Sequence, residues 1–283
     1  MIDRALVTTD WLAGELGRRG LRVVDGSMYL PTSGRDAAGE YAEGHIPGAV
    51  FFDLDASSDR GSALPHMIPS AEAFAARMGR LGIGDGDDVV VYDGSGGNLS
   101  AARAWWMFHV FGHSGAALLD GGIGKWRREG RPVERGATVL PPATFTSRPV
   151  PADRVRDLSA VRAAMVDGRT QIVDMRSAGR FAATDAEPRP GLRRGHIPGS
   201  LNLPYDTLVS GDGTVLPLEL LRRRLADAGV DPGRPLIATC GSGVSACALL
   251  HALHLLGYDH AGLYDGAWTE WGGRDDTPVE GGA

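Results

Sequence analysis

Short apolar runs alternate with amphipathic stretches along the chain. Residues 21–27 (LRVVDGS) and 170–176 (TQIVDMR) are compact apolar runs that each reach an aspartate, and each predicts a buried strand. Residues 70–83 begin with a serine, continue with helical apolar spacing and end beside a glycine, which predicts a capped helix. Residues 217–230 have the same pattern in the second half of the chain.

The same alternation continues towards the end of each half. Apolar runs at 87–93 (DDVVVYD) and 234–240 (RPLIATC) lead into glycine-rich loops, and each loop precedes a predicted helix, at 100–112 and 245–257. Further apolar runs follow each helix. Strands that alternate with helices predict a parallel sheet with helices on both faces, which is an α/β domain.

The chain contains the same pattern twice. GHIPGAV at residues 44–50 returns as GHIPGSL at residues 195–201, and the other motifs return in the same order. Two tandem copies of one domain, each of roughly 130 residues, explain this repetition. We therefore expect domains at residues 1–139 and 156–283. Residues 140–155 contain four prolines and no apolar periodicity, which is typical of an extended linker.

Two histidines belong to the repeated turn. His45 and His196 occupy the same place in the two GHIPG motifs. Because both copies retain the histidine, we expect it to have a structural role, with its ring bonded to backbone near the turn.

The overall composition excludes several classes of function. The 283 residues carry a net charge of −6, which argues against nucleic-acid binding. No apolar run reaches the roughly 18 residues of a membrane span, and the first residues lack the pattern of a signal peptide. The two cysteines form neither a disulfide framework nor a metal site, and fit reduced thiols in the cytoplasm.

Cys240 ends the apolar run at 234–240, where the carboxyl end of a parallel strand is expected. Ligands of open α/β sheets bind at this edge. The glycines after it allow backbone N–H groups to converge, and the following helix adds a positive partial charge. We expect this cradle to stabilise an anion, either the Cys240 thiolate or a bound substrate group. The loop is composed of Gly241, Ser242, Gly243, Val244 and Ser245.

Cys240 is therefore a candidate nucleophile. Cys247 lies among alanines and leucines on the next helix, which predicts a packing role. A cysteine phosphatase would need an arginine six residues after its cysteine, where this chain has Ala246. The loop also lacks the C-x-x-C pattern of thioredoxin-like sites and the dinucleotide fingerprint. The chemistry that remains is a cysteine that accepts a sulfur atom.

The tandem GHIPG motifs, the loop CGSGVSA and the segment YDGAWTEWG together resemble two-domain rhodanese-type sulfurtransferases. The resemblance spans nearly the whole chain. The loop is similar to that of 3-mercaptopyruvate sulfurtransferases, whereas thiosulfate-preferring relatives carry basic residues directly after the cysteine. This chain has Gly241 and Ser242 there. The first copy has Asp93 where the second has Cys240, so the resemblance implies that only the second domain is catalytic.

The resemblance also implies roles for other residues. The arginines of the GRF and EPR segments, Arg180 and Arg189, are expected to bind the substrate. Ser242 is expected to act with His66 and Asp55 in a relay that stabilises or protonates the departing enolate. Three more arginines lack a motif match, and we expect them to be solvated surface charges: Arg176, Arg193 and Arg194.

The implied reaction transfers sulfur from 3-mercaptopyruvate through a persulfide on Cys240, with release of pyruvate. Neither a metal nor an organic cofactor is expected. The acceptor is cyanide, a small thiol or thioredoxin. Two alternatives stay open: thiosulfate as the main donor, and a non-catalytic sulfur carrier or binding module.

Overall fold

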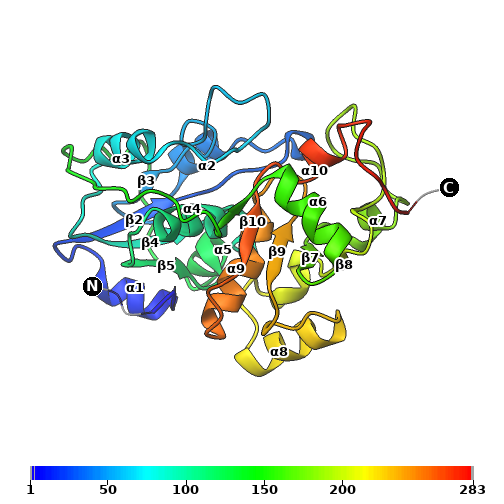
Figure 1. The fold of residues 1–283 in the computed structure, drawn as a ribbon. Helices are drawn as coiled ribbons and strands as arrows, with labels where there is room; N and C mark the ends of the chain where they lie inside the picture. The colour runs from blue at the N-terminus through cyan, green and yellow to red at the C-terminus, as the bar shows by residue number, and fades with distance from the viewer. Residues whose placement is uncertain (1, 3, 282–283) are drawn as a thin grey trace. The chain divides into compact units, whose positions relative to one another are not determined.

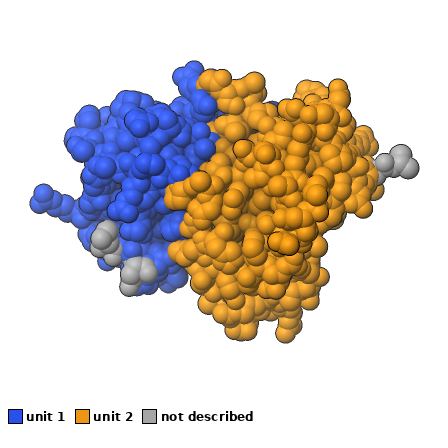
Figure 2. All heavy atoms as spheres, viewed as in Figure 1, with its two compact units in different colours: residues 1–60, 68–150, 209–215 blue, residues 61–67, 151–208, 216–283 orange. Residues whose placement is uncertain are grey.

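The computed structural model describes residue 2 and residues 4–281, and divides the chain into two compact units (Figures 1 and 2). The first unit contains residues 1–60, 68–150 and 209–215. The second contains residues 61–67, 151–208 and 216–283. The segments 61–67 and 209–215 depart from simple chain order. The domain limits expected from the sequence stay a prediction.

The first unit is built on a five-stranded sheet in the order β1-β5-β4-β2-β3, and all its strand pairs are parallel. Its strands are β1 (Leu6–Val7), β2 (Leu21–Asp25), β3 (Val50–Phe51), β4 (Asp88–Tyr92) and β5 (Ala116–Leu119). Its helices are α1 (Thr9–Glu15), the 3₁₀ turn η1 (Pro31–Ser33), α2 (Ala37–Glu43), α3 (Ala71–Arg80), α4 (Leu99–Val110) and α5 (Gly122–Arg128).

The second unit repeats this plan with the sheet order β6-β10-β9-β7-β8, again entirely parallel. Its strands are β6 (Val155–Arg156), β7 (Gln171–Asp174), β8 (Leu201–Asn202), β9 (Leu236–Thr239) and β10 (Gly262–Tyr264). Its helices are α6 (Leu158–Asp167), α7 (Ala178–Phe181), η2 (Tyr205–Leu208), α8 (Leu218–Asp227), α9 (Ala246–Leu255) and α10 (Ala267–Trp271). The predicted fold class, two tandem α/β domains with parallel sheets flanked by helices, is confirmed.

Local sequence explains where these elements begin and what they bury. Ser70 caps α3 by accepting a hydrogen bond from the N–H of Ala73, and Phe74 and Met78 on the helix are buried. Every residue of β4 is buried, as expected of a central parallel strand covered on both faces.

One fully buried tryptophan occupies the same place in both units. The indole N–H of Trp126 donates to the carbonyl of Pro132 at 2.7 Å, and that of Trp271 donates to the carbonyl of Pro278 at 2.7 Å. Each side chain thus buries a large apolar area while its single donor is satisfied.

The repeated histidines have the structural role expected of them. The His45 ring stacks on Tyr41 at 4.2 Å and its Nδ1 lies 2.9 Å from the Tyr41 carbonyl. The His196 ring stacks on Phe181 at 3.7 Å and its Nδ1 lies 2.8 Å from the Phe181 carbonyl. Because a carbonyl only accepts hydrogen bonds, Nδ1 carries the proton in both rings. This contact also aligns Tyr41 with Phe181 in the repeat.

The two glycine loops also correspond in position. Asp93 follows β4 and Cys240 follows β9, and each stands six residues before the first residue of a helix, Leu99 of α4 or Ala246 of α9. The carboxyl end of an equivalent strand and the start of an equivalent helix therefore enclose each loop.

The first loop shows what this geometry does with a negative charge. The Asp93 carboxylate, which is buried, accepts hydrogen bonds from the backbone N–H groups of Ser95, Ser100 and Ala101 at 2.8, 2.8 and 2.9 Å. It also accepts from the hydroxyls of Ser95 and Ser100 at 2.6 and 3.2 Å. The loop and the start of α4 together form an anion-binding cradle.

Replacing Asp93 by alanine should lower the free energy of unfolding by about 2 kcal/mol, because several buried donors lose their acceptor. Urea unfolding followed by circular dichroism measures this loss. The control is Asp36→Ala, which removes an exposed cap that accepts from the N–H of Ala38 at 3.1 Å. That variant should lose only about 1 kcal/mol. An Asp93→Ala protein as stable as the parent would contradict the cradle.

Candidate active site

Cys240 lies at the carboxyl end of β9 with its side chain directed into a buried environment. The residue is 1 % exposed. Its carbonyl accepts a hydrogen bond from the N–H of Trp268 at 3.0 Å, and the carbonyl of Gly241 accepts from the N–H of Thr269 at 3.0 Å. The first turn of α10 therefore holds the backbone of the cysteine loop in place.

The rest of the loop turns tightly into α9. Gly243 has a φ of 74°, a left-handed conformation that favours glycine. Ser242 and Val244 are buried and Ser245 is half-buried. Cys247 is completely buried and its thiol donates to the carbonyl of Gly243 at 3.4 Å. The expectation that Cys247 packs within the helix is confirmed.

Ser242 and His66 meet in the second unit although 176 residues separate them in sequence. The Ser242 Oγ lies 3.0 Å from the His66 Nδ1, and both residues are buried. His66 has a φ of 59°, a costly conformation for a residue other than glycine, so the surrounding structure holds its backbone in place. Asp55 is an exposed residue of the first unit, and its part in a relay stays a prediction.

The side chain of Arg180 extends from α7 to the cysteine loop. Ser177 caps this short helix by accepting a hydrogen bond from the Arg180 N–H. The Arg180 Nη2 lies 2.9 Å from the place where a Cβ on Gly241 would be. Glycine at this position therefore leaves room for the guanidinium beside Cys240. Arg189 is half-buried in the bend after Glu187, and its role in substrate binding stays a prediction.

The expectation that Arg176 is a solvated surface charge is wrong. Its side chain is 0 % exposed, with Nη2 2.6 Å from Asp174 and Nη1 2.8 Å from Glu187. Burial alone would lower the pKa of Arg176, but the two carboxylates outweigh it and hold the pKa above its usual value. Both carboxylates compensate the buried charge, which explains how an arginine is tolerated there.

The expectation that Arg193 is a solvated surface charge is also wrong. Its guanidinium donates to the carbonyl and the hydroxyl of Thr277 and to the carbonyl of Trp271. Arg194 is exposed, as expected. Arg193 therefore ties the segment before the GHIPG turn to the end of the chain.

Glu187 is a charged residue that sequence reasoning missed. It accepts hydrogen bonds from both Arg176 and Arg180, and its side chain is 2 % exposed. A signal for it was present in the repeat. His45 follows Tyr41 by four positions, whereas His196 follows Phe181 by fifteen. Glu187 and Arg189 lie in that additional segment of the second copy.

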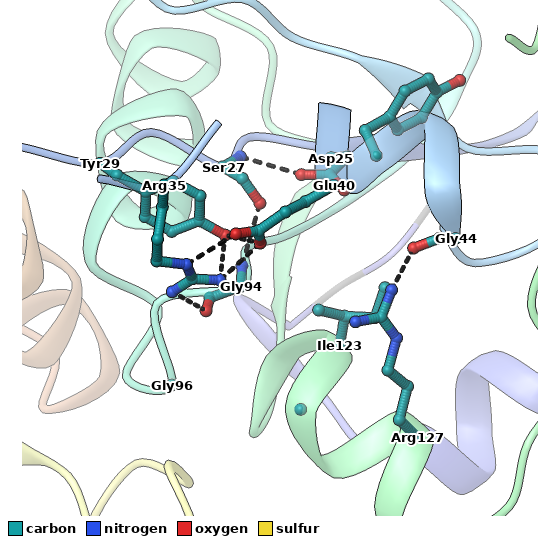
Figure 3. Close-up of a pocket in the computed structure, with 12 residues that line it drawn as sticks. Asp25, Ser27, Tyr29, Arg35, Glu40, Gly44, Gly94, Gly96, Ile123 and Arg127 are labelled. Atoms are coloured by element: carbon teal, nitrogen blue, oxygen red, sulfur yellow. Dashed lines mark hydrogen bonds and ion pairs between the residues drawn. The ribbon is translucent and has the colours of Figure 1, made fainter. Parts of the chain in front are cut away.

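The equivalent place in the first unit is a small pocket of about 100 Å³ (Figure 3). Glu40 stands there where the second copy has Arg180, as the alignment of GEYA with GRFA shows. Arg35 donates from Nε to Glu40, from Nη1 to the Gly94 carbonyl and from Nη2 to Tyr29 and Glu40. With Asp93 in place of a cysteine, this pocket offers no thiol. Of the two arginines that line it, Arg35 is occupied by neighbouring groups and Arg127 donates from Nη2 to the carbonyl of Gly44.

Among the described residues, no helix combines the length and the apolar character that crossing a membrane requires.

Comparison with known proteins agrees with this architecture. The family model of the Rhodanese-like domain matches residues 8–129 and again residues 157–274. The 3-mercaptopyruvate sulfurtransferase of Homo sapiens is 44% identical over 95% of this chain and 92% of its own length. The thiosulfate sulfurtransferase of Cricetulus griseus is 42% identical over 96% of this chain and 93% of its own.

A solved structure gives the same result in three dimensions. The crystal structure of SseA from Escherichia coli, described as a 3-mercaptopyruvate sulfotransferase with the rhodanese fold, superposes with a TM-score of 0.85 at 41% identity. The match covers 93% of this chain and 98% of SseA. With two matched domains, a repeated parallel sheet and full-length relatives, the chain belongs to the rhodanese family.

Proposed function

We propose that this protein is a sulfurtransferase that takes sulfur from 3-mercaptopyruvate, forms a persulfide on Cys240 and passes the sulfur to a thiol or to cyanide. The observation that carries the proposal is the position of the Arg180 guanidinium next to Gly241, beside a buried cysteine whose loop corresponds to the one that binds the Asp93 carboxylate. The proposed carboxylate-binding group thus lies next to the residue that follows the proposed nucleophile.

The Cys240 thiolate attacks the sulfur of the donor. A new S–S bond forms while the C–S bond of the donor breaks, and the electron pair of that bond passes to the carbon chain as the enolate of pyruvate. Protonation completes pyruvate, which leaves. An acceptor thiolate or cyanide then attacks the outer sulfur of the persulfide and releases the Cys240 thiolate. The Asp93 loop supports the first step because the same loop geometry there stabilises a full negative charge.

Ser242 and His66 supply the polar groups near the departing enolate. The Ser242 hydroxyl lies two residues after the nucleophile and is hydrogen-bonded to His66 Nδ1 at 3.0 Å. We assign Ser242 to donate towards the substrate oxygen on which negative charge develops, with His66 orienting it. Asp55 completes this relay in our proposal.

Arg180 favours a donor with a carboxylate, because a planar guanidinium binds a carboxylate through two parallel hydrogen bonds. Arg189 is assigned as its partner on the substrate. Thiosulfate is the second candidate donor, since a thiosulfate sulfurtransferase is among the full-length relatives at 42% identity. Gly241 favours the carboxylate donor, because a basic side chain at this position would meet the Arg180 guanidinium.

The physiological acceptor that we propose is a reduced thiol, with thioredoxin as a candidate. Both cysteines of the chain are free thiols in the structure. A cytoplasmic location, where thiols are kept reduced, fits this chemistry.

Mixing the protein with 3-mercaptopyruvate and no acceptor should release one equivalent of pyruvate and add one sulfur to the peptide that contains Cys240, as mass spectrometry would show. Cys240→Ser should abolish both signals, and Cys247→Ser, a buried packing residue, should retain them. A Cys240→Ser protein with full turnover would refute the proposal. A persulfide that no acceptor discharges would favour the non-catalytic carrier instead.

Arg180→Ala should lower kcat/KM for 3-mercaptopyruvate by roughly 100-fold, the size expected for a lost charge-assisted hydrogen-bond pair. The loss for thiosulfate, which has no carboxylate, should be smaller. Steady-state assays with both donors measure the difference, and Arg194→Ala, an exposed arginine, is the matched control. Equal losses for the two donors would argue against a carboxylate-binding role.

Ser242→Ala and His66→Ala should each reduce kcat for 3-mercaptopyruvate by about 100-fold, as is typical when a proton-transfer or oxyanion-stabilising group is removed. The double variant should be little worse than either single one, because residues that act as a unit are not additive. His260→Ala, an exposed histidine, serves as the control. Fully additive losses would show that the two residues act separately.

A further inference from the structure

We propose that Glu187 is a positioning residue, which orients Arg180 so that one edge of its guanidinium stays available for the carboxylate of the sulfur donor. This inference rests on the proposed function, because it assigns the source of donor selectivity at the same site. Glu187 itself does not contact the reacting atoms in this proposal and acts through Arg180.

Glu187 binds one side of the Arg180 guanidinium. Its Oε1 accepts from the Arg180 Nε at 3.2 Å and its Oε2 accepts from Nη2 at 2.5 Å. Two parallel hydrogen bonds to the Nε and Nη2 side fix both the position and the plane of the guanidinium. The Glu187 side chain is 2 % exposed, so water does not compete effectively for these bonds.

The opposite edge of the guanidinium, formed by Nη1 and the second N–H of Nη2, is directed towards the cysteine loop. Nη2 lies 2.9 Å and Nη1 3.7 Å from the place of a Cβ on Gly241. Within residues 2 and 4–281, no group accepts a hydrogen bond from the Arg180 Nη1. A carboxylate next to Cys240 therefore finds a second bidentate edge that the protein has not used.

Arg176 holds the Glu187 side chain in place. Its Nη1 donates to the Glu187 Oε1 at 2.8 Å. Arg176 in turn is held by Asp174, by the carbonyl of Gly195 at 2.8 Å and by the ring of Trp268, whose centre lies 4.2 Å from the guanidinium carbon. Asp174, Arg176, Glu187 and Arg180 thus form a row of alternating charges. This row runs from the carboxyl end of β7 to the cysteine loop.

The first unit lacks this arrangement at the matching place. There the acid, Glu40, stands where the second unit has Arg180, and Arg35 uses Nη1 on the carbonyl of Gly94 (Figure 3). Arg35 therefore leaves no such edge next to the loop that follows β4. The additional segment that contains Glu187 occurs only in the copy that has the thiol.

Charge and position predict opposite effects for a Glu187→Gln variant. Removal of a negative charge next to the loop should, by electrostatics alone, increase the attraction for an anionic reagent. The amide of glutamine, however, directs an N–H group at the arginines and cannot retain both bonds to Arg180. If Glu187 positions Arg180, recognition of a carboxylate should therefore weaken in spite of the more positive charge.

The test compares two alkylating reagents at Cys240. Bromopyruvate carries a carboxylate on the carbon chain of the proposed donor, and bromoacetone has a methyl group in its place. The rate of Cys240 modification by each is measured by peptide mass spectrometry in the full chain. The ratio of the bromopyruvate rate to the bromoacetone rate should fall roughly tenfold in Glu187→Gln, the effect of one lost charge-assisted hydrogen bond.

Two further variants separate the positioning role from a failure to fold and from a general effect of removing a carboxylate. Glu187→Asp retains the charge but is one methylene shorter, so it too should lower the ratio, and it replaces Glu187→Gln if that protein does not fold. Glu219→Gln removes the acid of an exposed pair with Arg222 in the same unit and should leave the ratio unchanged. A ratio that rises in Glu187→Gln would show a charge effect alone, and an unchanged ratio would show a merely structural role.

Alkylation does not require sulfur transfer. A protein that never turns over 3-mercaptopyruvate but shows the expected fall in the ratio would refute the proposed function and leave the positioning role intact. The reverse outcome, full sulfur transfer with an unchanged ratio, would refute the positioning role only. In the assay of sulfur transfer, the loss in Glu187→Gln should lie mainly in KM for 3-mercaptopyruvate, because the nucleophile and Ser242 are untouched.

Discussion

The junction of a parallel strand, a glycine loop and a helix is the constraint on which both units depend, and in the first unit backbone N–H groups converge there on Asp93. A parallel strand, a six-residue loop and a helix N-terminus bring several backbone donors together. Those donors need a negative partner. Asp93 supplies it permanently in the first unit, with three backbone and two hydroxyl donors around its carboxylate. In the second unit the buried Cys240 stands at the equivalent place.

This division lets one architecture serve two purposes. The buried tryptophans Trp126 and Trp271 and the stacked histidines His45 and His196 are the same in both units, because they stabilise the fold. The charged groups differ. Arg35 pairs with Glu40 in the first unit and also binds the carbonyl of Gly94, whereas Arg180 pairs with Glu187 beside the Cys240 loop. Structural features are thus shared between the copies, and chemical features are confined to one.

Much of the fold was predictable from the sequence, because apolar periodicity is a local property of the chain and the internal repeat can be read by comparing its two halves. The same holds for Cys240 and its loop. The burial of Arg176 was not predictable in this way. Its tolerance depends on Glu187, eleven residues away, and on the packing that brings the two together. The contact of Ser242 with His66 came from motif resemblance alone, since no local pattern links residues 176 positions apart.

The additional segment between Phe181 and His196 has a consequence for how such a protein changes over generations. Its two ends are fastened to each other by the stacked rings and the Nδ1 bond, as the shorter segment of the first copy is. The entropy cost of closing a loop grows only slowly with its length. Residues other than Glu187, which compensates the buried charge of Arg176, can therefore be gained or lost within this closed loop at little cost to the sheet.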